Sequence, residues 1–243
     1  MINLNNKRIL LIMAMHDEAK PLLSKLALKD NGRLNPNYTI EHYSGQISGH
    51  KIDLIVNGKC SVYKVDQIGT QVSTLCAHIG IQEFKPNIIL NAGTAGGFLS
   101  DNAKVGDVYL SYPVINYHDR RINIPDFKEY GIGQYPAYNC TSIAKDICLR
   151  TGIVTTGNSL DYTEQDMAMI KSYNGVVKDM EAAAIAWVAQ QHGLPFLAIK
   201  SITDIVDGEH PTEKEFIKNL HIASESLARQ TVKVIDWFIK EGI

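Results

Sequence analysis

The chain has 243 residues, of which 45% are hydrophobic and 21% charged, and its formal net charge is −2. This composition is ordinary for a globular protein, and it lacks the strongly basic balance that a nucleic-acid partner would require. Because no Pro-, Ser- or Gly-rich linker divides a chain of this length, we expect a single domain over residues 1–243.

The amino-terminal residues and the cysteines bear on the cellular compartment. Residues 1–6 lack the apolar core of a signal peptide, and the apolar run that follows is too short to span a membrane. The cysteines, at positions 60, 76, 140 and 148, form neither a CxxC pair nor a zinc-ligand pattern. We therefore expect reduced, mostly buried thiols in a cytoplasmic protein that binds neither nucleic acid nor membrane.

Strand-like runs alternate with helical stretches along the whole chain. Several of these runs are continuously apolar and rich in Ile, Val and Leu, as expected for strands that are covered on both faces. The alternation predicts an α/β fold in which helices flank a twisted central β-sheet. The expected strands are 8–14, 52–57, 87–91, 107–115, 152–157, 175–178 and 195–203.

Two helices are signalled most clearly in the last third of the chain. Asp179 is a candidate cap for a helix that continues to His192, where Gly193 and Pro195 end it. The last helix opens with Thr212–Glu215, which has the capping-box pattern. Its apolar residues recur at three- and four-residue multiples and predict one buried face. They are Phe216, Leu220, Ala223, Leu227, Val234 and Phe238.

Carboxylates and a glycine-rich turn follow four of the expected strands. Glu18, Glu181 and Asp204 each come just after a strand, and the strand 87–91 leads into Asn91–Gly97. Because ligands of open α/β sheets bind beyond the carboxyl ends of the strands, these groups are candidates for one small pocket. Three acids in such a pocket suit acid/base chemistry on a neutral or cationic polar ligand.

Each of these features also has an ordinary structural explanation. An acid in the first turn of a helix favours the helix dipole, which would account for Glu18 and Glu181. The turn Gly93–Gly97 has the spacing of neither a Walker A loop nor a dinucleotide fingerprint. Asp204 is harder to explain, since it ends a highly apolar strand where an acid needs partners. The basic stretch His118–Arg121 is expected to make surface or subunit contacts.

Taken together, several stretches resemble the methylthioadenosine/S-adenosylhomocysteine nucleosidases of the nucleoside phosphorylase superfamily. The resemblance runs over residues 8–239. Its landmarks are Ala14–Glu18, Asn91–Gly97, Lys178–Ala184 and Ser201–Asp204. The stretches that look closest to the plant-type branch are His118–Pro125, Thr156–Asp161 and Asp204–Gly208.

The resemblance implies an α/β subunit with a mixed sheet that pairs as a homodimer. It implies an adenine nucleoside substrate, hydrolysis of the N-glycosidic bond to a 5′-thio-substituted ribose, a place in methionine salvage, and no metal or organic cofactor. It also implies that 5′-methylthioadenosine is used at least as well as S-adenosylhomocysteine.

Site residues are carried over by position. Asp204 would deliver a proton to adenine N7, Glu18 would activate the water that attacks C1′, and Glu181 would accept hydrogen bonds from the ribose. The chemistry agrees with these roles, because adenine leaves poorly until N7 is protonated and its departure leaves positive charge that carboxylates stabilise. The other implied substrate-binding residues are Met15, Thr94, Ala95, Gly96, Leu160, Asp161 and Met180.

The chain departs from the family pattern at three positions. Met13 stands where a glycine is common, His16 replaces an acid beside Glu18, and Asn158 stands where an aspartate is common. Since the family aspartate lies in the adenine loop, Asn158 matters most. An amide still accepts and donates hydrogen bonds there, so we expect tuning rather than loss of activity.

Two alternatives stay open. A purine nucleoside phosphorylase would use phosphate in place of water, but the carboxylate of Glu18 at the nucleophile position would repel phosphate. A non-catalytic nucleoside-binding or storage protein on the same scaffold would be expected to lack catalytic acids, whereas this chain keeps Glu18, Glu181 and Asp204. Base release with and without phosphate distinguishes these possibilities.

Overall fold

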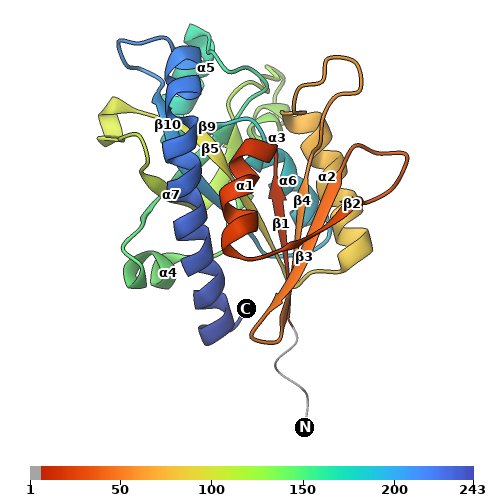
Figure 1. The fold of residues 1–243 in the computed structure, drawn as a ribbon. Helices are drawn as coiled ribbons and strands as arrows, with labels where there is room; N and C mark the ends of the chain where they lie inside the picture. The colour runs from red at the N-terminus through yellow and green to blue at the C-terminus, as the bar shows by residue number, and fades with distance from the viewer. Residues whose placement is uncertain (1–6) are drawn as a thin grey trace.

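A mixed β-sheet runs through the centre of the protein and carries helices on both faces (Figure 1). The computed structural model describes residues 7–243, so residues 1–6, on which the targeting expectation depends, lie outside the described residues. The strands are β1 (Arg8–Met13), β2 (Lys29–Arg33), β3 (Glu41–Ile47), β4 (His50–Val56), β5 (Ile88–Gly97), β6 (Val108–Tyr117), β7 (Tyr135–Pro136), β8 (Arg150–Thr156), β9 (Gly175–Asp179) and β10 (Phe196–Ile205). The helices are α1 (His16–Lys25), α2 (Thr70–Phe84), a 3₁₀ turn (Leu99–Asp101), α3 (Phe127–Ile132), α4 (Thr141–Asp146), α5 (Glu164–Ser172), α6 (Ala182–Gln191) and α7 (Thr212–Glu241).

The described strands follow the order β10-β6-β8-β9-β5-β1-β4-β3-β2, and β7 pairs with β6. Because β10 also pairs with β5, the strands β5, β10, β6, β8 and β9 form a closed ring. Both β1 and β10 run parallel to β5, whereas β9 runs antiparallel to it. The predicted α/β class with a mixed central sheet is confirmed, and each of the seven expected strands is present.

Helices cover both faces of the sheet, which explains why the strands read as continuous apolar runs. In β1, Leu10 and Ile12 pack toward α2 and α6, whereas Ile9, Leu11 and Met13 pack toward α1 and α7. Figure 1 shows α1 and α7 side by side over one face, where Lys25 and Glu225 form an ion pair of 3.5 Å. Complete burial of one such aliphatic side chain contributes about 1.5–3 kcal/mol, so both layers add substantially to stability.

The two helices expected from the sequence are present, but their first turns differ from expectation. Glu181, and not Asp179 as predicted, is the N-cap residue of α6, but Asp179 Oδ2 accepts a hydrogen bond from the N–H of Ala182 at 2.8 Å in the first turn. The capping box predicted for Thr212–Glu215 is wrong, because Pro211 is the N-cap residue of α7 and makes no side-chain cap bond. Glu215 instead accepts a hydrogen bond from the N–H of Ile205 at 2.9 Å, which joins α7 to the end of β10.

Three further observations concern the cysteines, membranes and metals. Cys76 and Cys140 are buried, whereas Cys148 is exposed and Cys60 is half-buried, so burial was correctly expected for only two of the four thiols. Between residues 7 and 243, no helix is both long and apolar enough to cross a bilayer. The same residues contain no cluster of three or more His, Cys, Asp or Glu side chains arranged to hold a metal ion.

Candidate active site

A cavity of about 490 Å³ opens where β5, β9 and β10 end and where the chain leaves β1. Its wall includes most of the site residues predicted from the sequence, namely Met15, Glu18, Thr94, Ala95, Gly96, Leu160, Met180, Glu181 and Asp204. Asp161 is the exception, since it is exposed and does not line the cavity. Four segments that are distant in the sequence thus meet at one edge of the sheet, as the strand-end argument predicts.

Glu18 lies in the first turn of α1 and is only 3% exposed. Its Oε1 accepts a hydrogen bond from the N–H of Thr94 at 2.8 Å and a second bond from the Thr94 hydroxyl. Its Oε2 is buried and has no hydrogen-bond partner within residues 7–243. Burial raises the pKa of Glu18, although the Thr94 bonds and the Lys200 cation oppose that shift. One oxygen therefore holds the carboxylate in place, while the other stays available to a bound molecule.

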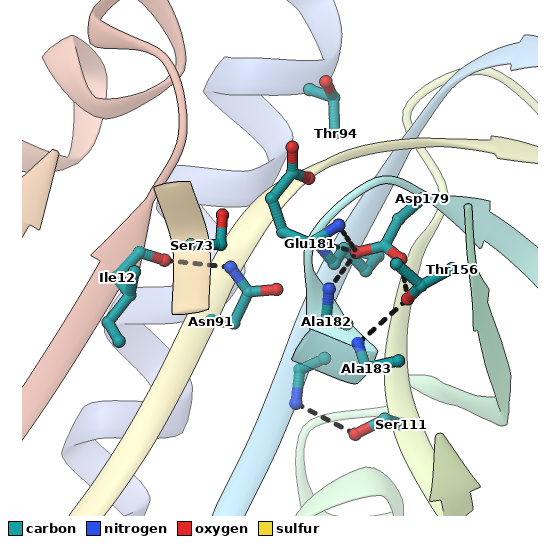
Figure 2. Close-up of polar contacts among 12 residues, drawn as sticks. Ile12, Ser73, Asn91, Thr94, Ser111, Thr156, Asp179, Glu181, Ala182 and Ala183 are labelled. Atoms are coloured by element: carbon teal, nitrogen blue, oxygen red, sulfur yellow. Dashed lines mark hydrogen bonds and ion pairs between the residues drawn. The ribbon is translucent and has the colours of Figure 1, made fainter. Parts of the chain in front are cut away.

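A buried cation lies beneath the carboxylates. Lys200 of β10 is fully buried, and its Nζ lies 2.7 Å from Asp179 Oδ2. Asp179 also accepts hydrogen bonds from the Thr156 hydroxyl at 2.5 Å and from the N–H of Ala182 (Figure 2). Together with the Lys200 ion pair, these bonds fix the position of its carboxylate. Burial lowers the pKa of Lys200, but Asp179 and Glu181 more than offset this and raise it, so the lysine stays charged.

Glu181 precedes α6 and is the third carboxylate of this cluster. Its Oε1 accepts a hydrogen bond from the N–H of Gly69 at 3.0 Å. Burial raises the pKa of Glu181 to about 7; Lys200 opposes the shift, while Asp179 and Glu18 reinforce it. One ammonium thus neutralises only part of the charge of three nearby carboxylates. Near neutral pH, this arrangement favours retention of a proton within the cluster.

Asp204 lines the same cavity and has a different environment. It is 2% exposed, and its Oδ1 accepts a hydrogen bond from the Thr203 hydroxyl at 2.7 Å. The other oxygen, Oδ2, lies above Gly96, where an added Cβ would approach it to 2.9 Å. Burial raises the pKa of Asp204, whereas Thr203 and the Lys178 cation lower it. A carboxyl beside the cavity whose pKa is raised by burial is suited to act as an acid.

Asn158 does not line the cavity, although its position in the adenine loop of the resemblance suggested that it would. Its Oδ1 accepts hydrogen bonds from the N–H of Thr70 at 3.0 Å and from the Thr70 hydroxyl at 2.8 Å, at the start of α2. Its own N–H donates to Asp119 Oδ2 at 2.7 Å. Asn158 therefore ties two loops to the first turn of α2. The adjacent Gly69 is the donor to Glu181, so this tie supports the site indirectly.

We expect Asn158→Asp to keep near-normal activity and Asn158→Ala to lower stability. The aspartate keeps the oxygen that accepts from Thr70, and a negative charge is favourable at a helix N-terminus. The alanine leaves an N–H of the first turn without its partner, which typically costs about 0.5–2 kcal/mol in urea unfolding.

A matched control is available in Asn139, which accepts from the N–H and the hydroxyl of Thr141 at the start of α4 in the same way. Asn139→Ala should lower stability by a comparable amount and leave KM unchanged. Asn158→Ala should also raise KM, because its partner Thr70 adjoins Gly69, whose N–H donates to Glu181. Equal KM values for the two alanine variants would show that Asn158 has no effect on the site.

The stretch His118–Arg121 has structural roles. His118 is 2% exposed, and its Nδ1 lies 3.2 Å from the Thr155 hydroxyl. The guanidinium of Arg120 lies 4.7 Å from the centre of the Tyr117 ring, and Arg121 pairs with Asp166. None of these residues lines the cavity, so the expectation that this stretch serves contacts rather than chemistry is consistent with its placement. Whether it contacts a second subunit stays a prediction.

Several cavity residues were missed by sequence reasoning. Lys178 lines the wall beside Asp204, Phe216 of α7 closes one side, and Lys59, Lys64 and Asp66 come from the loop after β4. The sequence did contain a signal for Lys178, since a charged residue within an apolar strand needs partners. The loop residues gave no such signal, because charged residues in a loop ordinarily face water.

The sequence and the fold of this chain were compared with those of known proteins. The sequence profile of the phosphorylase superfamily matches residues 8–236. A 5′-methylthioadenosine nucleosidase of Arabidopsis thaliana is 37% identical over 231 residues, which cover 94% of this chain and 86% of the relative. A 5′-methylthioadenosine/S-adenosylhomocysteine nucleosidase of the same plant is 36% identical, with coverage of 94% and 91%. The apo structure of the Arabidopsis 5′-methylthioadenosine nucleosidase superposes with a TM-score of 0.93, at 36% identity and 96% coverage of both chains.

Proposed function

The chain belongs to the phosphorylase superfamily, and we propose that it hydrolyses the N-glycosidic bond of 5′-methylthioadenosine, releasing adenine and the 5-thioribose product. S-adenosylhomocysteine is the second substrate of the proposal, because one of the similar plant enzymes is named for both nucleosides. The observation that carries the proposal is the convergence of Glu18, Glu181 and Asp204 on one cavity. The reaction would belong to methionine salvage in the cytoplasm, catalysed by a single domain over residues 1–243.

In the proposed mechanism, Asp204 supplies the proton that adenine needs at N7. Burial raises the pKa of this carboxyl and so favours its protonated form, which can protonate the base as the C1′–N9 bond breaks. Positive charge then develops on the ribose. Glu18 and Glu181 line the cavity and stabilise that charge electrostatically. No step in this sequence calls for a metal ion or an organic cofactor.

Glu18 is the proposed general base for the attacking water. Its Oε1 is held by Thr94, while Oε2 is the oxygen left free to accept a hydrogen bond from water. Glu181 would accept hydrogen bonds from the ribose hydroxyls with Met180 packed beside the sugar. Thr94, Ala95 and Gly96 would line the sugar and purine. Met15 would contact the substrate, Leu160 would cover the base, and the backbone of Asp161 would read its edge.

The proposal is tested by measuring adenine release from both nucleosides under identical conditions. We expect release from 5′-methylthioadenosine at a kcat/KM at least equal to that for S-adenosylhomocysteine. Phosphate should not be required and EDTA should have no effect. A requirement for phosphate would identify a phosphorylase, and tight nucleoside binding without turnover would identify a binding protein. Phosphorolysis is disfavoured because the buried Lys200 is already paired with Asp179.

A homodimer is also part of the proposal, because two segments expose several large apolar residues. Those of the loop after β4 are Val62, Tyr63, Val65 and Ile68, and those within residues 115–138 are Ile124, Phe127 and Tyr130. Two of the loop residues, Val65 and Ile68, line the cavity itself. A second copy that covers this surface would bury it and narrow the entrance to the site.

Light scattering at micromolar concentration should therefore give the mass of a dimer. Phe127→Glu, which places a charge on the exposed surface, should shift the protein toward monomers and lower its activity. The control is Ile222→Glu on α7, where the side chain is exposed to a similar extent. This variant should leave the dimer intact. A fully active monomer in the unmodified protein would contradict the dimer.

A further inference from the structure

Three residues lie in one row across adjacent strands at the cavity wall. In the sheet register, Asp204 of β10 pairs with Gly96 of β5, and Gly96 pairs in turn with Lys178 of β9. Neighbouring strands are about 4.8 Å apart, and residues opposite one another in the register project from the same face. Both Asp204 and Lys178 line the cavity. The residue between them in the register is a glycine without a side chain, and the charge of Lys178 acts on the Asp204 carboxyl across it.

The ammonium of Lys178 also reaches from the sheet to a loop. Its Nζ donates hydrogen bonds to the carbonyl oxygen of Ser159 at 2.7 Å and to that of Leu160 at 2.9 Å. This loop joins β8 to α5, and Leu160 forms part of the cavity wall. Two adjacent peptide groups are thereby held in one orientation by a side chain that is anchored in β9.

The fold itself does not need a cation at this place. Lys178 is only 5% exposed, and burial lowers the pKa of its ammonium, which means that the charge is unfavourable there. Ser159 and Leu160 are exposed, so water could satisfy both carbonyls if the lysine were absent. A neutral side chain of similar length would avoid the desolvation of the charge. A buried charge that stability does not require is characteristic of a functional site.

We propose that Lys178 is a positioning residue for the reaction. It holds the loop at Ser159 and Leu160 over the purine, and its positive charge favours the ionised form of Asp204 over the protonated form. This role rests on the proposed function. Besides Lys178, Asp204 faces the Thr203 hydroxyl and the carboxylate of Glu215. Around Lys178 itself lie Asp204, Asp179, Asp161 and Asp166, and also His118, whose pKa is lowered to about 4 so that it is neutral at pH 7.

Removing Lys178 is expected to have one harmful and one favourable effect: weaker binding of the base, and activity that extends to higher pH. Loss of the tether weakens binding of the base. Loss of the cation raises the pKa of Asp204, because the Lys178 charge favours its ionised form. Asp204 acts in its protonated form, so the fall in kcat at alkaline pH should move to higher pH when the cation is removed. A residue that only supported the fold would not extend activity toward alkaline pH.

The experiment compares Lys178→Met, Lys178→Gln and Lys178→Arg with Lys171→Met, a surface control on α5. Adenine binding is measured by calorimetry, and kcat is measured against pH with 5′-methylthioadenosine and with a nitrophenyl riboside, whose leaving group needs no protonation. In Lys178→Met, the Kd for adenine should rise about tenfold, as expected for two lost bonds to a charged donor. The fall in kcat at alkaline pH should move to higher pH with the nucleoside and stay in place with the nitrophenyl riboside.

The other variants separate the tether from the charge. Lys178→Gln should show the same pH shift with a smaller loss of adenine binding, and Lys178→Arg should keep the normal pH profile. Melting temperatures should change little, since Ser159 and Leu160 are exposed residues of a loop. An adenine Kd within twofold of the unmodified protein, or an unmoved alkaline limb in both Met and Gln variants, would overturn the inference. Failure of the unmodified protein to release adenine would instead refute the proposed function, while the adenine-binding comparison would still test the tether.

Discussion

Asp204→Asn is expected to lower kcat for adenine release by at least about 10²-fold, the usual size of general acid catalysis. The amide can still hydrogen-bond to the purine, so KM should change much less than kcat. It cannot transfer a proton to N7, and adenine must then leave as a high-energy anion. The Thr203 hydroxyl can still donate to the amide oxygen, so the local structure at the end of β10 should persist.

A substrate with an activated leaving group is the control for this prediction. A nitrophenyl riboside leaves without protonation, so its hydrolysis by Asp204→Asn should be affected far less than that of 5′-methylthioadenosine. If both substrates slow equally, Asp204 positions the sugar or supports the structure and is not the acid. Thr203→Val offers a second comparison, because it removes the donor to Asp204 Oδ1 and leaves the carboxyl able to donate.

Glu18→Gln is expected to bind substrate and to hydrolyse it very slowly. The glutamine oxygen can accept the hydrogen bonds from Thr94 that hold Oε1, so the side chain should stay in place. Its amide can hold a water molecule but cannot take the proton of that water, which removes the general base. A loss of about 10²–10⁴-fold in kcat follows from the usual contribution of such a base. Near-normal kcat with unchanged melting would remove Glu18 from the mechanism.

The stability of this variant should also depend on pH in a defined direction. Burial raises the pKa of Glu18 in the folded protein above its ordinary value. Such a group contributes stability at low pH, and that contribution is lost as pH rises through the folded-state pKa. Glutamine stays neutral throughout, so the melting temperature of Glu18→Gln should fall less than that of the unmodified protein as pH rises. The lost contact with the α1 dipole should cost only about 0.3–1 kcal/mol.

Local patterns in the sequence were sufficient to predict most of the sheet and the general place of the site. The strands β1, β5 and β10 were predicted because strands covered on both faces require unbroken apolar runs. The hairpin of β2 and β3 was missed, since the residues of β2 are polar and exposed and carry no burial pattern. Glu18 and Asp204 could be grouped before any contact was known, because β1 and β10 run parallel to β5 and parallel strands bring their carboxyl ends to one edge. Glu181 follows β9, which runs antiparallel to β5, and it reaches the same edge because the last residues of the two strands pair with each other.

The orientation of Asp204 depended on the register of β10 against β5. The register shifts between Ile202 and Asp204, where Thr203 forms a bulge. One extra residue reverses the alternation of faces, so Asp204 reaches the cavity although simple alternation from the core residue Ile202 would direct it elsewhere. A bulge of this kind depends on the partner strand and leaves no local signal in β10.

Pairings between distant residues were likewise decided only by the tertiary structure. Lys200 meets Asp179, Lys178 meets the loop at Ser159 and Leu160, and Asn158 meets Thr70, which is 88 positions away. A sequence shows that a buried lysine or a cap needs a partner, because an unpaired charge or N–H is costly. Which partner satisfies it depends on which segments the sheet order brings together, and that order follows from packing over the whole fold.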